Sequence, residues 1–554
     1  MKFNCPLSAS AVCSFLKIHM KKIQIYDTTL RDGSQGEDIS FSVDDKLHIA
    51  HKLDELGLDY IEGGWPGSNF KDMAFFKRVP ELGLKHARVA AFGSTAHPKN
   101  SKVEDDNNIQ ALIEAGTPVV TIFGKSWDLH VRVALGISLE RNIELIRDSV
   151  AYLKSLGKEV IYDAEHFFDG FQADRDYALS TLKAAEQAGA DTIVLCDTNG
   201  GTLTEEIRDR TLVAISVLKA PIGIHTHNDS DMGVANAVIA IRHGAVHVQG
   251  TFNGYGERCG NANLCSIIPN IELKLGMRAI GHEKLKSLTE VSHYVSEIAN
   301  MHHRQDFPFV GKSAFAHKGG IHVSAVMKEP MAYEHIAPET VGNERRVLIS
   351  ELSGKSNVLY KAERMGLQID KASAGTQAVV NKLKEMEHYG YQFEGAEASF
   401  EILFSKLMNE HSEFFELDGF RVITERKGNG ASTSEAVIKL RVDGTEEHTA
   451  AEGVGPVSAL DHALRKSLTT FFPCIKDIRL TDYKVRVLNA KGATDAKVRV
   501  LIETSDGHET WGTVGVSENL IEASWLALVD SITYKLKKDY GSKRKENQIK
   551  IAAE

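Results

Sequence analysis

Eight short runs of apolar and β-branched residues alternate with amphipathic segments between Lys22 and about residue 255. The runs expected to form strands are residues 23–28, 60–63, 87–92, 118–123, 160–164, 192–197, 223–227 and 246–252. Strands separated by helices pair in parallel. Eight such units in about 260 residues therefore predict an α/β fold, a (β/α)8 TIM barrel. A doubly wound sheet is the competing arrangement, but no G-x-G-x-x-G motif follows the first run.

Two further regions follow the predicted barrel, which we assign to residues 20–280. Residues 281–391 are expected to form helical linker subdomains, because several of their segments are amphipathic. Residues 392–540 are expected to form an α+β domain. Its predicted strands are residues 399–407, 420–427, 435–442, 483–488, 497–504 and 509–516, and its predicted helices are residues 456–472 and 520–536. This order suggests a duplication of two βββα halves.

The two ends of the chain are expected to lie outside the folded domains. Residues 541–554 form a charged tail, and residues 1–19 form an N-terminal extension without a structural role. Pro6 and several polar residues interrupt the apolar character of these first residues, which argues against a signal peptide. Met20 opens a strand-like segment, and we expect it to be the physiological start.

Composition and charge exclude several classes of protein. Hydrophobic residues make up 42% and charged residues 25% of the 554 residues, as in ordinary globular proteins. The net charge of −10 argues against a nucleic-acid partner. No apolar stretch approaches the length of about 18 residues that a membrane span requires. Six cysteines are too few for a disulfide framework, so a reducing, cytoplasmic setting is expected.

Residues that can hold a metal follow the predicted strands, at the end where TIM barrels carry their active sites. Asp32, after the first strand, offers a carboxylate to a divalent cation. Its neighbour Arg31 can form two parallel hydrogen bonds to a carboxylate or an enolate, although an Arg–Asp pair in a turn is the alternative. His225 and His227 stand two apart in the seventh strand, so their imidazoles project from the same face. This spacing suits the joint ligation of one metal.

A glycine-rich segment, residues 253–263, follows the eighth predicted strand. Within it, Asn261 could add an amide oxygen to the metal site. One carboxylate and two imidazoles fit Mn²⁺, Mg²⁺, Co²⁺ or Zn²⁺, and the sequence does not choose among them. With open coordination positions, such an ion suits the binding of a 2-oxo acid.

The chain resembles the family of 2-isopropylmalate, homocitrate and citramalate synthases. The motifs that carry the resemblance are DTTLRDG, LCDTNG, HTHND, GYGERCGNAN, AFAHKGGIH, AEGVGPV and WGTVGVS, and it extends from residue 20 to about residue 540. It implies an acyltransferase with a metal-dependent barrel that joins acetyl-CoA to a 2-oxo acid in a Claisen condensation. Hydrolysis of the thioester then releases CoA.

The resemblance also implies roles for barrel residues. Asp32, His225 and His227 match the metal ligands, and Asn261 lies in or near that shell. Arg31 matches a catalytic arginine that binds the substrate and polarises its 2-oxo group. Thr198 matches a residue that contacts the substrate carboxylate, and Glu165 matches a catalytic glutamate at the end of the fifth strand.

Two catalytic residues are expected from the linker region. His322 matches the histidine base of the family, and Tyr333 matches a tyrosine beside it. His317 is a rival for the base, and whether Glu165 or His322 takes the first proton stays open. In relatives the linker of the partner subunit supplies this base, so the resemblance implies a homodimer.

The expected substrate follows from one position at which the chain departs from the usual sequence of 2-isopropylmalate synthases. Trp65 stands where 2-isopropylmalate synthases carry a small or aliphatic residue. With its long C-terminal half, the chain looks most like the longer class of (R)-citramalate synthases, which use pyruvate. A bulky indole at the barrel mouth would favour pyruvate, and a tryptophan packed under a loop is the alternative.

The C-terminal domain resembles a regulatory domain that binds an end-product amino acid, and isoleucine is the expected effector.

Two other activities remain open at this point. A 2-isopropylmalate synthase would use 2-oxoisovalerate and respond to leucine. A lyase of the hydroxymethylglutaryl-CoA type would share the aspartate and the two histidines but would cleave a carbon–carbon bond. The long C-terminal half and the linker motif around His322 argue against the lyase.

Overall fold

The computed structural model of the protein describes residues 21–348, 355–364, 374–393, 395–408, 413–426, 428, 430, 432–488 and 496–553. The extension expected at residues 1–19 lies outside the described residues. The chain divides into two compact units. The first comprises Met1–Phe315 with Ile336–Arg345, and the second comprises Ala316–His335 with Arg346–Glu554.

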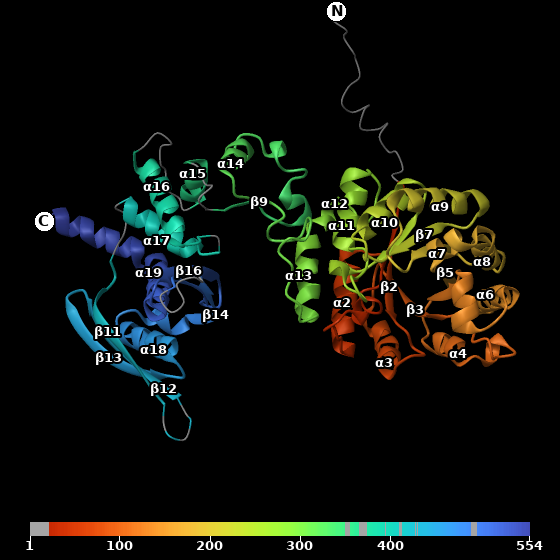
Figure 1. The fold of residues 1–554 in the computed structure, drawn as a ribbon, viewed down its shortest axis with the longest axis horizontal. Coiled ribbons are helices and arrows are strands. Elements are labelled where there is room, and N and C mark those ends of the chain that lie inside the picture. Colours follow the sequence, from red (N-terminus) through yellow and green to blue (C-terminus); the bar gives the residue numbers. More distant parts are fainter. Residues whose placement is uncertain are drawn as a thin grey trace, which may run out of the picture. The chain divides into compact units, whose positions relative to one another are not determined.

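Eight parallel strands close into a barrel in sequence order (Figure 1). They are β1 (Gln24–Asp27), β2 (Tyr60–Gly64), β3 (Arg88–Ser94), β4 (Val119–Lys125), β5 (Glu159–Glu165), β6 (Thr192–Asp197), β7 (Ile222–Thr226) and β8 (His247–Gly250). Strand β1 pairs with both β2 and β8, which closes the ring. Each strand overlaps one of the predicted apolar runs, and the predicted TIM barrel is confirmed.

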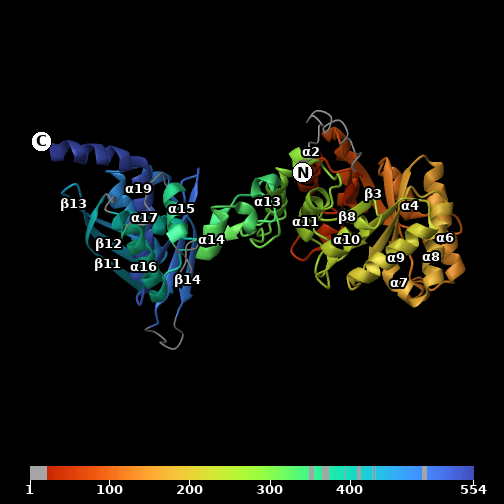
Figure 2. The same cartoon turned by 90° about the horizontal axis from the view of Figure 1, so that it is seen from above.

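Helices cover the outside of the barrel (Figure 2). The longer ones are α2 (Val43–Leu56), α3 (Phe70–Arg78), α4 (Asn107–Glu114), α6 (Leu139–Ser155), α8 (Arg175–Gln187), α9 (Thr204–Val217) and α10 (Gly233–Arg242). Helix α2 shows how the sequence sets the ends of a helix. The side chains of Ser42 and Asp45 each accept a hydrogen bond from the other residue's N–H, forming a capping box. Gly57 ends the helix with a φ of 92°, a left-handed conformation that glycine adopts without strain.

Aromatic rings and buried polar groups fill the inside of the barrel. The ring centroid of His247 lies 5.3 Å from that of Tyr26 and 5.6 Å from that of Tyr60. Both ring nitrogens of His247 are buried, and neither has a hydrogen-bond partner among the described residues. Burial, with smaller effects of the Arg88 and His225 charges, lowers the pKa of His247 to about 3. The folded barrel therefore holds this imidazole in its neutral form.

The first unit continues beyond the barrel strands through three helices. They are α11 (Leu264–Pro269), α12 (His282–Leu285) and α13 (Leu288–Ile298). Helix α13 is tied to the loop after β8, because the Asn253 amide donates to the Ser292 carbonyl at 2.8 Å and to Ser296 Oγ at 3.0 Å. The compact barrel unit therefore extends past residue 280, where we placed the end of the barrel.

The second unit begins with short elements and ends in an α+β domain. The first elements are β9 (Ala316–His317), α14 (Gly320–Val326), β10 (Arg346–Val347), α15 (Lys355–Arg364), α16 (Ala374–Tyr389) and α17 (Glu397–Leu407). Two antiparallel sheets follow, each with a helix against it (Figure 1). They are β11 (Glu416–Arg426), β12 (Ser432–Val442) and β13 (Thr445–Gly453) with α18 (Pro456–Thr469), and β14 (Arg479–Val487), β15 (Val498–Ser505) and β16 (Thr510–Ser517) with α19 (Leu520–Ala553). The predicted pair of βββα halves is confirmed.

Three details of this domain differ from the sequence-based expectation. Residues 399–407 belong to helix α17 and not to a strand, because Phe400 and Phe404 also satisfy helical spacing and bury one face of that helix. Strand β13 was not predicted, because it is an edge strand with few buried residues. Helix α19 continues to Ala553, into the segment that we expected to form a charged tail, residues 541–554.

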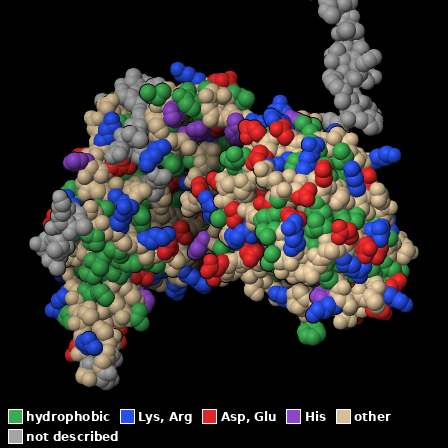
Figure 3. All heavy atoms as spheres, turned by 45° about the vertical axis from the view of Figure 1, so that its right-hand side comes forward, with side chains coloured by type: hydrophobic (Ala, Val, Ile, Leu, Met, Phe, Trp, Pro, Cys, Tyr) green, Lys and Arg blue, Asp and Glu red, His purple; other side chains and the backbone are tan. Residues whose placement is uncertain are grey.

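Among the described residues, no helix combines the length and the hydropathy needed to cross a bilayer. On the face of the molecule drawn in Figure 3, lysine and arginine side chains are interspersed with aspartate and glutamate side chains.

We expect His247→Phe to weaken the pH dependence of folding stability. The unfolded chain binds a proton at this histidine below its ordinary pKa of 6.5, whereas the folded barrel binds it only near pH 3. Stability is therefore lost as the pH falls from about 6.5 towards 3. Between pH 7 and pH 5.5 the wild type should lose about 1 kcal/mol that the variant retains, measured by urea unfolding with far-ultraviolet circular dichroism. His302→Phe, at an exposed histidine, is the control, and an unchanged slope in His247→Phe would contradict the expectation.

Candidate active site

Polar residues gather where the barrel strands end. Because all eight strands are parallel, their carboxyl ends meet at one face of the barrel. A cavity of about 210 Å³ opens there. The residues predicted for the site that border this cavity are Arg31, Asp32, Glu165, Thr198, His225 and His227.

Asp32, His225 and His227 form a compact cluster of possible metal ligands. One ligand atom from each lies within 4.8 Å of the others, and all three side chains are buried. Asp32 Oδ2 lies 3.3 Å from His225 Nε2 and 4.0 Å from His227 Nε2, and the two Nε2 atoms are 3.4 Å apart. One carboxylate and two converging imidazoles fit a divalent cation.

Burial and neighbouring charges set the protonation states of this cluster. Burial tends to raise the pKa of Asp32, but the Arg31 charge and the two histidines outweigh it and hold that pKa well below its usual range. Burial, assisted by repulsion from His225, lowers the pKa of His227 to about 4. Burial also opposes the charged form of His225, but Asp32 outweighs it and leaves the pKa of His225 raised. Asp32 is therefore an anion and His227 a neutral imidazole with a lone pair to share.

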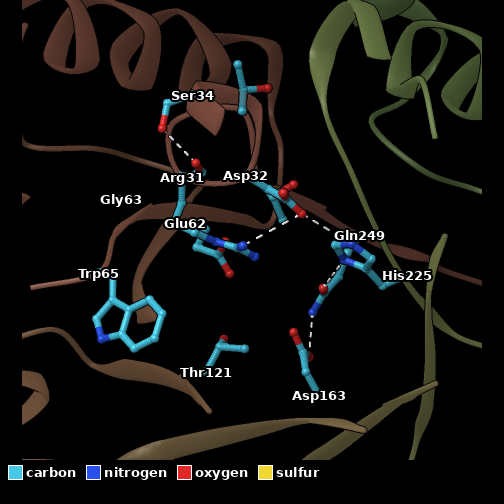
Figure 4. Close-up of polar contacts among 12 residues, drawn as sticks. Arg31, Asp32, Ser34, Glu62, Gly63, Trp65, Thr121, Asp163, His225 and Gln249 are labelled. Atoms are coloured by element: carbon cyan, nitrogen blue, oxygen red, sulfur yellow. Dashed lines mark hydrogen bonds and ion pairs between the residues drawn. The ribbon is translucent and has the colours of Figure 1, made fainter. Parts of the chain in front are cut away.

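A chain of hydrogen bonds orients His225 (Figure 4). Gln249 Nε2 donates to Asp163 Oδ1 at 3.0 Å, so Gln249 Oε1 is left to accept a hydrogen bond. His225 Nδ1 lies 2.8 Å from that oxygen, and its hydrogen therefore resides on Nδ1. In the neutral imidazole, the form that binds a metal, the lone pair of His225 is then on Nε2, the nitrogen that faces Asp32. The sequence motifs did not point to Gln249 and Asp163, although each is a polar residue within an apolar barrel strand, and that was the available signal.

Arg31 is fixed by contacts that the sequence did not reveal. Its Nε donates to Glu62, a fully buried carboxylate that also accepts a hydrogen bond from the Tyr26 hydroxyl at 2.7 Å. The Arg31 guanidinium lies over the Phe92 ring, 3.7 Å from its centroid. These contacts hold the guanidinium at the cavity wall beside Asp32 (Figure 4).

Glu165 and Thr198 border the cavity from β5 and the loop after β6. The Lys125 ammonium at the end of β4 pairs with the Glu165 carboxylate. Thr198 Oγ1 accepts a hydrogen bond from the His166 N–H at 2.9 Å, which leaves the threonine proton free to donate to a ligand. His166 has a φ of 55°, an uncommon conformation for a residue other than glycine.

The glycine-rich loop after β8 places Asn261 beside His227, with which it forms an isolated β-bridge. Asn261 Nδ2 donates to the Tyr255 carbonyl at 3.2 Å. Its Oδ1 is buried and has no hydrogen-bond partner among the described residues. Gly260 makes this path possible, because its φ is 82° and a Cβ there would lie 2.0 Å from the Gly254 carbonyl oxygen.

Three aromatic side chains form one wall of the cavity, which we call the aromatic wall: Trp65, Phe92 and Phe123. The rings of Phe92 and Phe123 are stacked, with centroids 5.5 Å apart. The Trp65 indole meets both rings edge-on, at 5.8 Å and 5.6 Å. Trp65 therefore borders the cavity, and it is not a tryptophan packed away from it.

The predicted linker residues belong to the second compact unit. The rings of His322 and Tyr333 lie 4.4 Å apart, and both side chains are exposed. His317 is buried, and its Nε2 lies 3.0 Å from a carboxylate oxygen of Glu334.

Three family models match consecutive parts of the chain. They are an HMGL-like model at residues 22–295, a homocitrate synthase post-HMGL domain-like model at residues 309–390, and a LeuA allosteric (dimerisation) domain at residues 394–536. This order corresponds to the barrel, the helical region after it and the duplicated βββα domain.

Curated relatives match over nearly the full chain. The (R)-citramalate synthase of Geobacter sulfurreducens is 55% identical, and that of Aquifex aeolicus is 54% identical. Each match covers 94% of this chain and 98% of the relative. A probable 2-isopropylmalate synthase of Methanopyrus kandleri is 32% identical, over 92% of this chain and 98% of the relative. The chain therefore belongs to the family of (R)-citramalate synthases and 2-isopropylmalate synthases.

Proposed function

We propose that this protein condenses acetyl-CoA with pyruvate and hydrolyses the resulting thioester, giving (R)-citramalate and CoA. The buried cluster of Asp32, His225 and His227 beside Arg31, at the mouth of the barrel, carries the proposal. The relatives of the chain support pyruvate as the substrate. Those at 55% and 54% identity are named (R)-citramalate synthases, while the probable 2-isopropylmalate synthase is 32% identical. Water enters in the hydrolysis, so one acetyl-CoA, one pyruvate and one water give citramalate and CoA.

The residues at the cavity suit the binding of a 2-oxo acid. Asp32, His225 and His227 would hold a divalent cation, and the unpartnered Asn261 Oδ1 is a fourth candidate ligand. Such a cation, when bound, polarises the 2-oxo group of the substrate. Arg31 is positioned to stabilise the oxygen that becomes an alkoxide as the new carbon–carbon bond forms. The free proton of Thr198 suits a hydrogen bond to the substrate carboxylate.

We assign the removal of a proton from the acetyl methyl group to His322. Its imidazole is exposed and lies beside the Tyr333 ring, so it is accessible to a substrate. The rival His317 is buried against Glu334, which suits a structural role. Glu165 is paired with Lys125, which suits the orientation of substrate more than the first proton transfer.

The aromatic wall supports pyruvate as the 2-oxo acid. Pyruvate carries a single methyl group next to its keto carbon, and the three rings on one side of the cavity suit a small apolar group. The branched side chain of 2-oxoisovalerate needs more room at the same place. A pocket of this kind discriminates by about 10–200-fold for each methylene.

Regulation and assembly belong to the same proposal. Residues 394–536 match a LeuA allosteric (dimerisation) domain, which supports a homodimer with an amino-acid effector. Isoleucine is the effector that suits a pyruvate-using enzyme of this family, and a cytoplasmic setting suits a biosynthetic role.

A panel of 2-oxo acids tests the substrate. With acetyl-CoA present, release of free CoA should be fastest with pyruvate, slower with 2-oxobutyrate and slowest with 2-oxoisovalerate, and each added methylene should lower kcat/KM about tenfold or more. A preference for 2-oxoisovalerate would indicate a 2-isopropylmalate synthase. Cleavage of 3-hydroxy-3-methylglutaryl-CoA in a parallel incubation would indicate a lyase.

Asp32→Asn tests the metal site. We expect the variant to bind Mn²⁺ at least about 100-fold more weakly in calorimetric titration, because it loses the only carboxylate of the buried cluster. Chelation should abolish wild-type activity, and added Mn²⁺ should restore it. Asp176→Asn, at an exposed position on α8, is the matched control. Equal Mn²⁺ affinity in Asp32→Asn and the wild type would contradict the assignment.

His322→Ala and His317→Ala test the base. Loss of His322 should lower kcat by about 10²–10⁴-fold and leave the KM for pyruvate near its wild-type value. Loss of His317 should lower the melting temperature and change kcat far less. The reverse order of kcat values would identify His317 as the base.

A further inference from the structure

The indole of Trp65 has a polar contact on the side away from the cavity. Its Nε1 donates a hydrogen bond to Asn108 Oδ1 at 2.7 Å. Asn108 lies on helix α4, outside the cavity, and is not among the residues that line it. A residue behind the aromatic wall therefore holds one of the three rings of that wall.

The side-chain amide of Asn108 has a single favourable orientation, in which its oxygen faces the indole. Its Nδ2 donates to the Ser94 carbonyl at 2.8 Å, which leaves Oδ1 to face the indole N–H. If the amide were turned over, its NH2 group would face the indole N–H, and its oxygen would face the Ser94 carbonyl oxygen, so neither hydrogen bond could form. Gly93 allows this approach, because a Cβ at that position would lie 2.8 Å from Asn108 Oδ1.

The backbone of Trp65 is fixed independently of Asn108. The Trp65 N–H donates to Asp72 Oδ2 at 2.9 Å. Asp72 also pairs with Lys46, whose side chain is 1% exposed and whose Nζ donates to the Gly63 carbonyl at 3.0 Å. Because the backbone is held in this way, Trp65 can change its conformation only through its side-chain torsions. The hydrogen bond from the indole to Asn108 restricts these torsions.

The orientation of the indole affects the substrate side of the cavity. The indole edge contacts Phe92 and Phe123, and the Arg31 guanidinium lies over Phe92. Trp65 and Arg31 both border the cavity, and Figure 4 shows the indole on the same side of the close-up as Arg31 and Glu62. A rotated indole would leave part of the wall open next to the guanidinium that faces the 2-oxo acid.

We propose that Asn108 is a positioning residue that sets which 2-oxo acids the cavity accepts, by fixing the indole of Trp65. This inference rests on the proposed function for the class of substrate. Without the Asn108 acceptor, the half-buried indole N–H loses its partner, and the ring turns to find another. The cavity then admits a longer apolar group than methyl.

A double-mutant cycle tests this route of action. The four proteins are the wild type, Asn108→Leu, Trp65→Phe and the double variant, and the readout is the ratio of kcat/KM for pyruvate to kcat/KM for 2-oxobutyrate. Each single variant should lower this ratio by roughly tenfold. Phenylalanine has no indole N–H, so the double variant should match Trp65→Phe alone.

Matched variants separate positioning from a general loss of stability. Asn236→Leu removes another helix asparagine whose Nδ2 donates to a backbone carbonyl, that of Thr202, at 2.8 Å. It should lower the melting temperature and leave the substrate ratio unchanged. Asn108→Asp keeps an oxygen for the indole N–H but loses the donor to the Ser94 carbonyl, so its ratio should lie between those of the wild type and Asn108→Leu. Asn108→Ala should behave as Asn108→Leu. In Asn108→Leu the KM for acetyl-CoA should stay near the wild-type value.

Three results would overturn the inference. The first is a wild-type substrate ratio in both Asn108→Leu and Asn108→Ala, and the second is a drop in that ratio when Asn108→Leu is added to Trp65→Phe that equals its drop in the wild type. The third is an equal loss of kcat with both substrates in Asn108→Leu. The cycle can be measured with any two 2-oxo acids of different length. If the wild type prefers 2-oxoisovalerate, the proposed function fails, but the coupling between Asn108 and Trp65 is still measurable.

Discussion

The pairing of β1 with β8 is the interaction on which the rest of the structure depends. It closes the ring of strands, and closure brings the carboxyl ends of β1 and β7 to the same face. Asp32 and His225 are nearly two hundred residues apart in the chain, yet their ligand atoms lie 3.3 Å from each other. An open sheet would place the first and seventh strands apart, and the metal cluster would not form.

Buried polar groups beneath the cavity give the site its geometry. Glu62 fixes Arg31 by accepting a hydrogen bond from its Nε. Gln249, held by Asp163, fixes the ring of His225. Each group is satisfied by another in a region of low dielectric, where an unpaired polar group would be costly and a paired one is strongly held. The same principle applies at the side of the cavity, where the bond from Trp65 to Asn108 orients an apolar ring.

The chemistry proposed for the protein is divided between its two compact units. The barrel provides the cation ligands, Arg31 and the aromatic wall, whereas the proposed base His322 belongs to the second unit. Within that unit, burial distinguishes the two candidate histidines, since His317 is packed against Glu334 and His322 is exposed. On this proposal, residues beyond the barrel take part in catalysis as well as in regulation.

The sequence by itself determined the eight-stranded barrel and the βββα duplication through local periodicity. It also indicated the cluster of Asp32, His225 and His227, because these residues lie at the ends of predicted barrel strands, and the carboxyl ends of parallel strands meet at one face. It did not determine helix α17, whose apolar residues fit both the strand and the helix period. Only the tertiary structure identified Glu62, Gln249 and Asn108. Their roles arise from contacts between distant segments, and no local pattern reveals which buried side chains will meet once the barrel closes.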